Sequence, residues 1–280
     1  MMSRKKLPSS DRLKGELLFD GEALHLIKCE KIVTPWQRSS YGKGSVMNQA
    51  DDSVYLLPTS IIDSDHESII GFSGKSIGDR DKDPVAKAVA LYYAVRDGIW
   101  YDPYYPFYLP EHYRASNVLK SGRGYCVCKA SLLCALGRAC GIPSRVGFAD
   151  VRNHLASAQL REMMGTDLFV YHGFMEFYLE GKWVIATPAF NKELCLKHKV
   201  APLEFTGRED SIFQPYNREK KKFMEYVTYH GSFSDIPVAR IVKAWEEAYG
   251  EDRVKLWIDA FEQSGGKSTR EFFNEEPLES

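Results

Sequence analysis

The sequence has no excess of charge of either sign. Its 280 residues carry 37 Lys and Arg against 38 Asp and Glu, a formal net charge of -1 at pH 7. A nucleic-acid-binding surface needs a basic excess to neutralise phosphates, and this chain has no long run of like charge in its place. We therefore expect no nucleic-acid partner.

Long apolar runs are also lacking. No stretch approaches ~18 uninterrupted apolar residues, about the length that a membrane-spanning helix needs. The first ten residues are basic and polar, and no apolar segment follows them, so we expect no signal peptide. The chain is therefore expected to have no membrane partner and to be cytoplasmic.

Cysteine is scarce. Six cysteines in 280 residues are too few for a disulfide scaffold, which agrees with a reducing cytoplasm. Four of them, Cys126, Cys128, Cys134 and Cys140, fall in one predicted helix without any Cys-x-x-Cys pair. A helix turns by ~100° and rises by ~1.5 Å per residue, so these side chains cannot converge on one ion. We predict no metal site and no cofactor.

What the chain does have is enough apolar material for a sizeable core, since 44% of its residues are hydrophobic. No repeat or low-complexity segment is visible, so one domain is predicted over residues 21–263. Residues 1–20 are expected to be a mobile N-terminus, and residues 264–280 a disordered tail. Residues 236–263 are predicted to form a helical extension whose apolar stripe docks on the domain or, alternatively, binds a partner.

One helix carries a candidate nucleophile. A glycine-rich approach precedes a helix predicted from Cys126 to about Ala139, and Gly141 and Pro143 stop it. The helix is apolar nearly all round, so it should be buried. Cys126 lies in its first turn, where unpaired N–H groups and the helix dipole stabilise an anion. We therefore predict a lowered pKa for the Cys126 thiol and core positions for the other helical cysteines.

A base for this thiol is predicted on a hairpin. Residues 168–179 and 182–187 read as two strands joined by a Glu-Gly dipeptide, which suits a two-residue turn. Side chains alternate along a strand, so this register makes Thr187 a diagonal neighbour of His172 on one face of the sheet.

Taken in order, these motifs resemble the core of the transglutaminase-like superfamily. The cysteine motif runs from Gly124-Tyr125-Cys126 to Gly141-Ile142-Pro143, and residues 172–178 resemble the histidine strand. Residues 96–102 resemble the segment upstream of the cysteine, so the match covers about residues 84–191. The resemblance, to a single-domain member of bacterial type, implies an α+β, papain-like fold. In such a fold a buried cysteine helix packs on an antiparallel β-sheet that bears the histidine.

The resemblance also implies a Cys–His–Asp triad, with Cys126 as nucleophile and His172 as base. Where the family has its aspartate, this chain has Thr187, whose hydroxyl can orient an imidazole but carries no charge. Asn191, just beyond, and Asp150, after the preceding strand, are alternatives for the same role. The sequence does not decide among the three.

The resulting hypothesis is acyl transfer on an amide bond through a thioester, with a protein, peptide or glycan–peptide amide as substrate. His172 takes the proton of Cys126, the thiolate attacks the carbonyl, and backbone N–H groups at the helix start hold the oxyanion. The acyl group then passes to water or to an amine, and the sequence does not distinguish these two outcomes. It does not give the oligomeric state either. The alternative is a non-catalytic binding or scaffold module of the same fold, suggested by the missing aspartate.

An aromatic segment precedes the cysteine helix. Residues 101–108 are rich in Tyr, Phe and Pro, and the prolines exclude regular structure. Aromatic rings offer rigid apolar surface. The segment is predicted either to pack over the core or to form the wall of a substrate cleft.

Overall fold

The structure is a computed structural model, and the residues it describes are 52–78, 83–154, 156–217, 219–265 and 271–276. They all lie within one compact unit, residues 38–280. The expected mobile N-terminus, residues 1–20, and the start of the predicted domain at residue 21 lie outside the described residues.

A four-stranded antiparallel sheet forms one layer, with the strand order β5–β4–β3–β6. Its strands are β3 (Ser144–Asn153), β4 (Leu168–Leu179), β5 (Lys182–Ala186) and β6 (Met224–Phe233). Strand β6 pairs with β3 along its length and forms one edge of the sheet.

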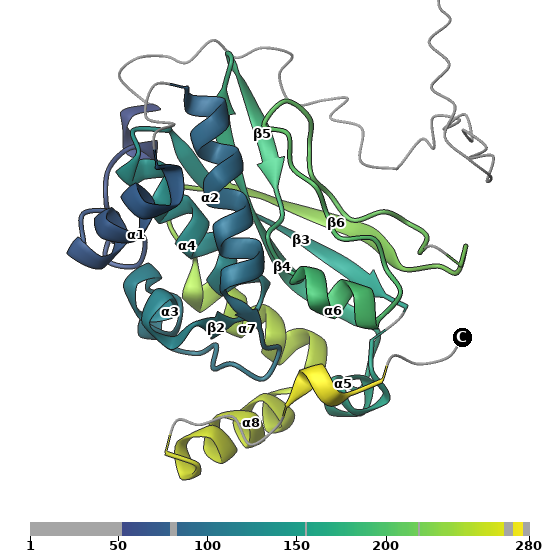
Figure 1. The fold of residues 1–280 in the computed structure, drawn as a ribbon. Coiled ribbons are helices and arrows are strands. Elements are labelled where there is room, and N and C mark those ends of the chain that lie inside the picture. The colour runs from purple at the N-terminus through teal and green to yellow at the C-terminus, as the bar shows by residue number, and fades with distance from the viewer. Residues whose placement is uncertain (1–51, 79–82, 155, 218, 266–270, 277–280) are drawn as a thin grey trace, which may run out of the picture. The chain divides into compact units, whose positions relative to one another are not determined.

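Helices cover one face of this sheet (Figure 1). They are α1 (Glu67–Ile77), α2 (Pro84–Gly98), α3 (Ala115–Ser121) and α4 (Cys126–Ala139). Helix α4 contacts β3 and β4 on one side and α1, α2 and α3 on its others. Every residue from Cys126 to Arg138 is buried, which explains why this helix is apolar nearly all round. The predicted α+β fold, with a buried cysteine helix on an antiparallel sheet, is confirmed.

The β4–β5 hairpin has the predicted register. Tyr178 pairs with Trp183, and Glu176 pairs with Ile185. Positive φ angles at both residues of the Glu-Gly turn, 48° and 81°, give the turn the twist that suits a two-residue hairpin. Strand β5 ends at Ala186, so Thr187 is the first residue beyond it.

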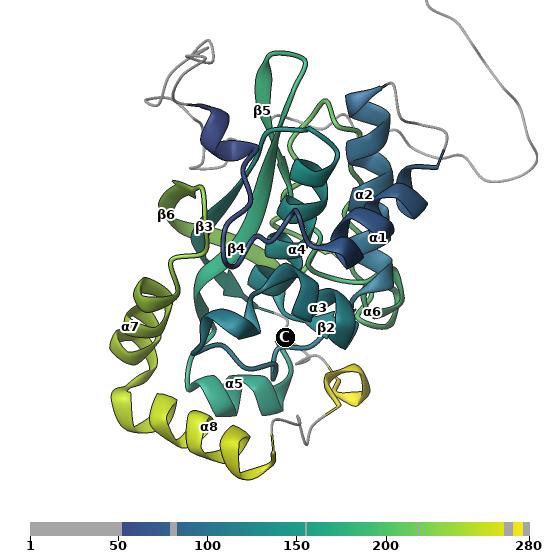
Figure 2. The ribbon, with the colours of Figure 1, turned by 90° about the vertical axis from the view of Figure 1, so that its left-hand side faces the viewer.

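The remaining elements lie outside the four-stranded sheet and helices α1 to α4. They are the two-residue strands β1 (Trp100–Tyr101) and β2 (Arg123–Gly124), helices α5 (Ala158–Met164), α6 (Lys192–Lys197), α7 (Val238–Tyr249) and α8 (Glu251–Gln263), and the 3-10 helices η1 (Asp52–Tyr55), η2 (Pro110–His112) and η3 (Phe272–Asn274). The predicted helical extension is thus two helices, α7 and α8, which meet at Gly250 with φ 94°. Figure 2 shows α8 beside α5. Ile241 and Val254 are buried, so the apolar stripe docks on the domain.

The described part of the C-terminal tail differs from the expected disorder. Within residues 271–276, Phe272 is only 7% exposed, and its ring packs edge-on against Tyr101 and Tyr104. Burial of this ring offsets part of the conformational entropy that ordering the segment costs. No helix in the described part of the chain is both long and apolar enough to cross a membrane.

Candidate active site

Cys126 is the first residue of α4 and lies directly against β4. The backbone N–H of Gly173 donates to the Cys126 Sγ at 3.4 Å. A Cβ atom at position 173 would lie 2.7 Å from the Cα of Val127, closer than real contacts allow. Glycine at this position therefore lets the histidine strand touch the start of the cysteine helix.

His172, the residue before this glycine, shares a cavity with Cys126. Both side chains line a narrow space of about 50 Å³. His172 is 6% exposed, and its ring lies 5.3 Å from the ring of Phe213 and 6.4 Å from that of Tyr226. Its buried Nε2 has no hydrogen-bond partner among the described residues. The structure therefore brings the predicted nucleophile and base to one site.

Burial sets the protonation of both groups. It raises the pKa of the Cys126 thiol to about 11, although the N–H groups of Gly173, Val127 and Cys126 itself act in the opposite direction. The predicted lowering of this pKa is therefore wrong, because desolvation of the thiolate outweighs the stabilisation by the helix start. Burial also lowers the pKa of His172 to about 3. At pH 7 the pair is a neutral thiol and a neutral imidazole.

Thr187 is buried next to Tyr92 and Tyr226. It is 1% exposed, and its backbone carbonyl accepts a hydrogen bond from the Tyr92 hydroxyl at 3.1 Å. Its hydroxyl has no partner at hydrogen-bond geometry in the described chain, but it lies close enough to the Tyr226 hydroxyl to lower the pKa of that group, which burial raises more strongly. Tyr226 thus neighbours both Thr187 and His172.

Asn191 has a different role from the one considered in the sequence. Its side chain accepts from the N–H of Tyr101 at 2.7 Å and donates to the carbonyl oxygens of Arg96 and Ile99, each at 2.8 Å. The side-chain amide of Asn191 therefore uses its hydrogen bonds on the backbone from the end of α2 to β1. Asn191 holds this segment in place and does not orient the imidazole.

The buried Lys129 of α4 supports the same segment, which the sequence did not suggest. Its Nζ donates to the carbonyl oxygens of Arg96 at 2.9 Å and Ile99 at 2.6 Å, and burial holds its pKa well below the usual range. The sequence signal that could have revealed this role is a lysine in an otherwise apolar helix, because a fully buried lysine requires hydrogen-bond partners.

Asp150 points toward a neighbouring cluster instead of the His172 ring. Its Oδ1 accepts from the backbone N–H of Tyr171 at 3.0 Å and lies 2.6 Å from the Nε2 of His230. The Asp150 carboxylate therefore bonds to the backbone of Tyr171, the residue before His172, and not to the His172 ring.

Two helices cover the cavity. Trp245 and Tyr249 of α7 line it from one side, and Leu160 and Met164 of α5 from another. Trp245 also stacks on Phe107, with ring centroids 4.3 Å apart and an interplanar angle of 27°. From the sequence we predicted only that the apolar stripe containing Trp245 docks on the domain. That this stripe covers Cys126 could not be predicted, because a contact between residues so far apart produces no local sequence pattern.

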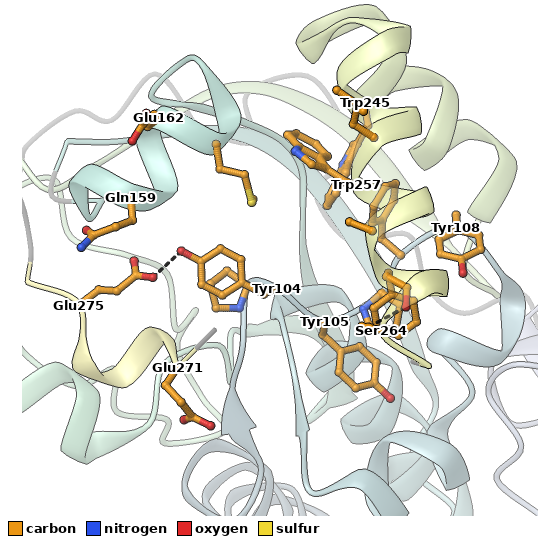
Figure 3. Close-up of a pocket in the computed structure, with 17 residues that line it drawn as sticks. Tyr104, Tyr105, Tyr108, Gln159, Glu162, Trp245, Trp257, Ser264, Glu271 and Glu275 are labelled. Atoms are coloured by element: carbon orange, nitrogen blue, oxygen red, sulfur yellow. Dashed lines mark hydrogen bonds between the residues drawn. The ribbon is translucent and has the colours of Figure 1, made fainter. Parts of the chain in front are cut away.

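A larger cleft of about 800 Å³ lies outside this cover (Figure 3). Pro103 and Trp245 line both spaces, so they form the wall between the cleft and the cavity. The aromatic residues 103–108 form part of the cleft, so this segment is a cleft wall as well as a packing loop. Glu162, Glu271 and Glu275 also line it, and none of the described lining residues is Lys, Arg or His.

Glu275 ties the tail to two sides of the cleft. Its Oε1 accepts from the Tyr104 hydroxyl at 2.6 Å (Figure 3), and its Oε2 accepts from Ser157, which caps α5. Among the described residues, no group of three or more His, Cys, Asp or Glu side chains could hold a metal ion.

Comparison with known proteins agrees with this arrangement. Residues 74–188 match the sequence model of the Transglutaminase-like superfamily. The resemblance seen in the sequence is thereby confirmed over residues 74–188. No curated protein matches the chain.

Two solved structures are similar at low identity. One, from Cytophaga hutchinsonii, is described as a putative cysteine protease, with 17% identity and a TM-score of 0.39 over 67% of this chain and 48% of that chain. The other is red sea bream transglutaminase, with 12% identity and a TM-score of 0.30 over 78% of this chain and 43% of that chain. The chain therefore spans less than half of either structure.

Alkylation of Cys126 should depend steeply on pH. Because the thiol has a pKa of about 11, its thiolate fraction rises about tenfold per pH unit between pH 7 and 10. The rate of labelling by iodoacetamide, measured by mass spectrometry of the peptide that contains Cys126, should rise in parallel. A rate that levels off below pH 8 would instead show a thiolate–imidazolium pair in the free protein.

Replacement of Gly173 by alanine should push strand β4, which bears His172, away from the start of α4, which bears Cys126. The new Cβ meets backbone atoms of α4, which cannot move aside as a flexible side chain can. We expect a loss of about 1–3 kcal/mol in the free energy of unfolding, measured by urea denaturation. Gly98→Ala, at the end of α2 where a Cβ meets nothing within 4 Å, is the control. Equal stability of the two variants would show that the contact at Gly173 is not tight.

Proposed function

We propose that this chain catalyses acyl transfer on an amide bond through a thioester on Cys126. The observation that supports the proposal is the shared cavity of Cys126 and His172 at the start of α4. His172 removes the thiol proton, and sulfur attacks the amide carbonyl to form a tetrahedral intermediate. The amine leaves with a proton from His172, and water or a second amine then releases the acyl group.

Thr187 is proposed to orient the imidazole. The buried Nε2 of His172 has no partner among the described residues, and the Tyr226 side chain neighbours both this imidazole and the Thr187 hydroxyl. A hydroxyl can fix the tilt of a ring without stabilising its positive charge. The cysteine thiol needs less help from a base than a serine hydroxyl does, so the missing aspartate is tolerable.

The covered state is proposed to be a resting state. Burial raises the pKa of the thiol and lowers that of the imidazole, so proton transfer from Cys126 to His172 is unfavourable while the cover is in place. Displacement of Trp245 by substrate would replace part of the apolar cover with the polar amide. Both pKa values would then return toward their ordinary range, and the proton transfer would become accessible.

The substrate is proposed to be an extended peptide or protein segment with a basic side chain. The outer cleft of about 800 Å³ is large enough for several residues, and its wall of Pro103 and Trp245 adjoins the cavity. Its aromatic lining suits apolar side chains. Its exposed carboxylate Glu162 suits a lysine or arginine.

A binding or scaffold module of the same fold is the second candidate. The observation that favours it is the protonation of the closed pair, neutral thiol and neutral imidazole, in a space of about 50 Å³. In that case the outer cleft would bind its partner without any reaction at Cys126.

Substitution of the nucleophile decides between the two candidates. A library of amide and peptide substrates is screened with the wild-type protein, and release of amine is measured. Cys126→Ala should lower the rate by about 10³-fold or more, because the covalent route is lost. Cys134→Ala, which removes another buried cysteine of α4, should keep the activity. Full activity of the Cys126→Ala variant would eliminate the thioester mechanism.

Peptide charge should affect binding at the outer cleft. Two peptides that differ by a single Lys or Glu beside the same aromatic residue are titrated against the Cys126→Ala variant, with tryptophan fluorescence as the signal. The Lys peptide should bind more tightly, and Glu162→Gln should reduce this preference by about 2- to 5-fold at low salt. Glu209→Gln, an exposed carboxylate that does not line the cleft, is the matched control. Equal binding of the two peptides would contradict the proposed substrate class.

A further inference from the structure

The pairing of the sheet is irregular near His172, in both β4 and β6. Between β3 and β4, Ala149 pairs with His172 but Val151 pairs with Phe169, so β4 carries an extra residue opposite Asp150. An irregularity of this kind, a β-bulge, bends a strand and re-aims its side chains, and bulges are common beside active sites.

The other neighbour of β3, strand β6, has one bulge at the same level and another opposite the step from Asp150 to Val151. Phe148 pairs with Gly231 and Ala149 with Tyr229, which leaves His230 of β6 as the extra residue. The central strand is therefore flanked on both sides by bulges, all within two residues of Ala149, which pairs with His172.

In β4 the bulge includes Tyr171, which has an unusual backbone conformation. Its φ is 54°, in the left-handed region that a side chain with a Cβ disfavours, and it directly precedes His172. A residue held in this region persists only where its surroundings stabilise it. The direction in which β4 presents His172 therefore depends on what holds Tyr171.

Two groups hold it, Asp150 from the adjacent strand β3 and His230 from β6, one strand further on. The Asp150 Oδ1 accepts from the Tyr171 N–H at 3.0 Å and pairs with the Nε2 of His230 at 2.6 Å. The ring of His230 stacks on that of Tyr171, with centroids 4.2 Å apart and an interplanar angle of 11°. The Asp150 and His230 side chains are only 14% and 23% exposed, so solvent competes weakly for these contacts.

We propose that Asp150 and His230 are positioning residues that hold Tyr171 in its left-handed conformation and thereby aim His172 at Cys126. This inference rests on the proposed role of His172 as the base. Asp150 supplies a carboxylate to the site without touching the imidazole, because it acts through the backbone of Tyr171. Arg240, Lys243 and Glu247 of α7 line the shallow pocket over the same cluster.

The test separates the acceptor oxygen of Asp150 from its charge. Asp150→Ala removes the acceptor and should lower kcat by about 10- to 100-fold with little change in KM, since the base is misplaced after substrate has bound. Asp150→Asn keeps an oxygen at the same place and should retain kcat within about 3-fold. Glu225→Ala removes the pair between this β6 carboxylate and His154, the residue after β3, and should leave kcat unchanged.

A rescue by glycine tests the backbone route. Glycine adopts a positive φ without strain, so Asp150→Ala combined with Tyr171→Gly should recover most of the kcat that Asp150→Ala loses. If Asp150→Ala does not fold, the Tyr171 variants carry the test alone. Tyr171→Gly and Tyr171→Val both remove the stacked ring, but only valine opposes the left-handed conformation, so only Tyr171→Val should lose activity.

The ring NMR signals of His172, assigned with His172→Gln, give a readout that needs no turnover. They should shift in Asp150→Ala, return in the double variant, and stay unchanged in Glu225→Ala. The proposal is overturned if Asp150→Asn is as impaired as Asp150→Ala, or if glycine at 171 restores neither kcat nor the ring signals. Absence of all acyl transfer in the wild-type protein would instead refute the proposed function, while the ring signals would still report on the positioning.

Discussion

The contact between the start of α4 and strand β4 is the constraint on which the site depends. Gly173 lacks a side chain, so its N–H reaches the Cys126 sulfur and its backbone lies on Val127. The same approach places His172, one residue earlier, at the rim of the cavity that holds the thiol. Neither the nucleophile nor the base would be useful without this proximity, and both ends of the contact are buried in the core of the domain.

Burial is also what separates the resting site from a reactive one. The helix start favours a thiolate, but the cover formed by α5 and α7 removes the water that a thiolate needs, and the second effect is larger. The imidazole loses its proton for the same reason. In the proposed reaction the outer cleft and its tryptophan wall connect substrate binding to the restoration of a polar environment around Cys126.

Much of the fold could be predicted because the signals are local. The helix from Cys126 to Ala139 and the hairpin register follow from apolar periodicity, stop residues and turn chemistry, and the structure agrees with them. The roles of Asn191 and Asp150 could not be predicted in this way. Each polar side chain had several possible partners in the chain, and only the packing of α2, β1 and β6 around them selects one.

The sequence by itself determined the resemblance to the transglutaminase-like superfamily, the order of the cysteine and histidine motifs and the absence of an aspartate at Thr187. These depend on residue identity and short-range spacing, which a chain carries before it folds. The tertiary structure decided the pKa of Cys126, the cover over the cavity and the paired bulges beside His172. Desolvation and strand pairing are set by residues far apart in the chain, so their outcome exists only once those residues are packed together.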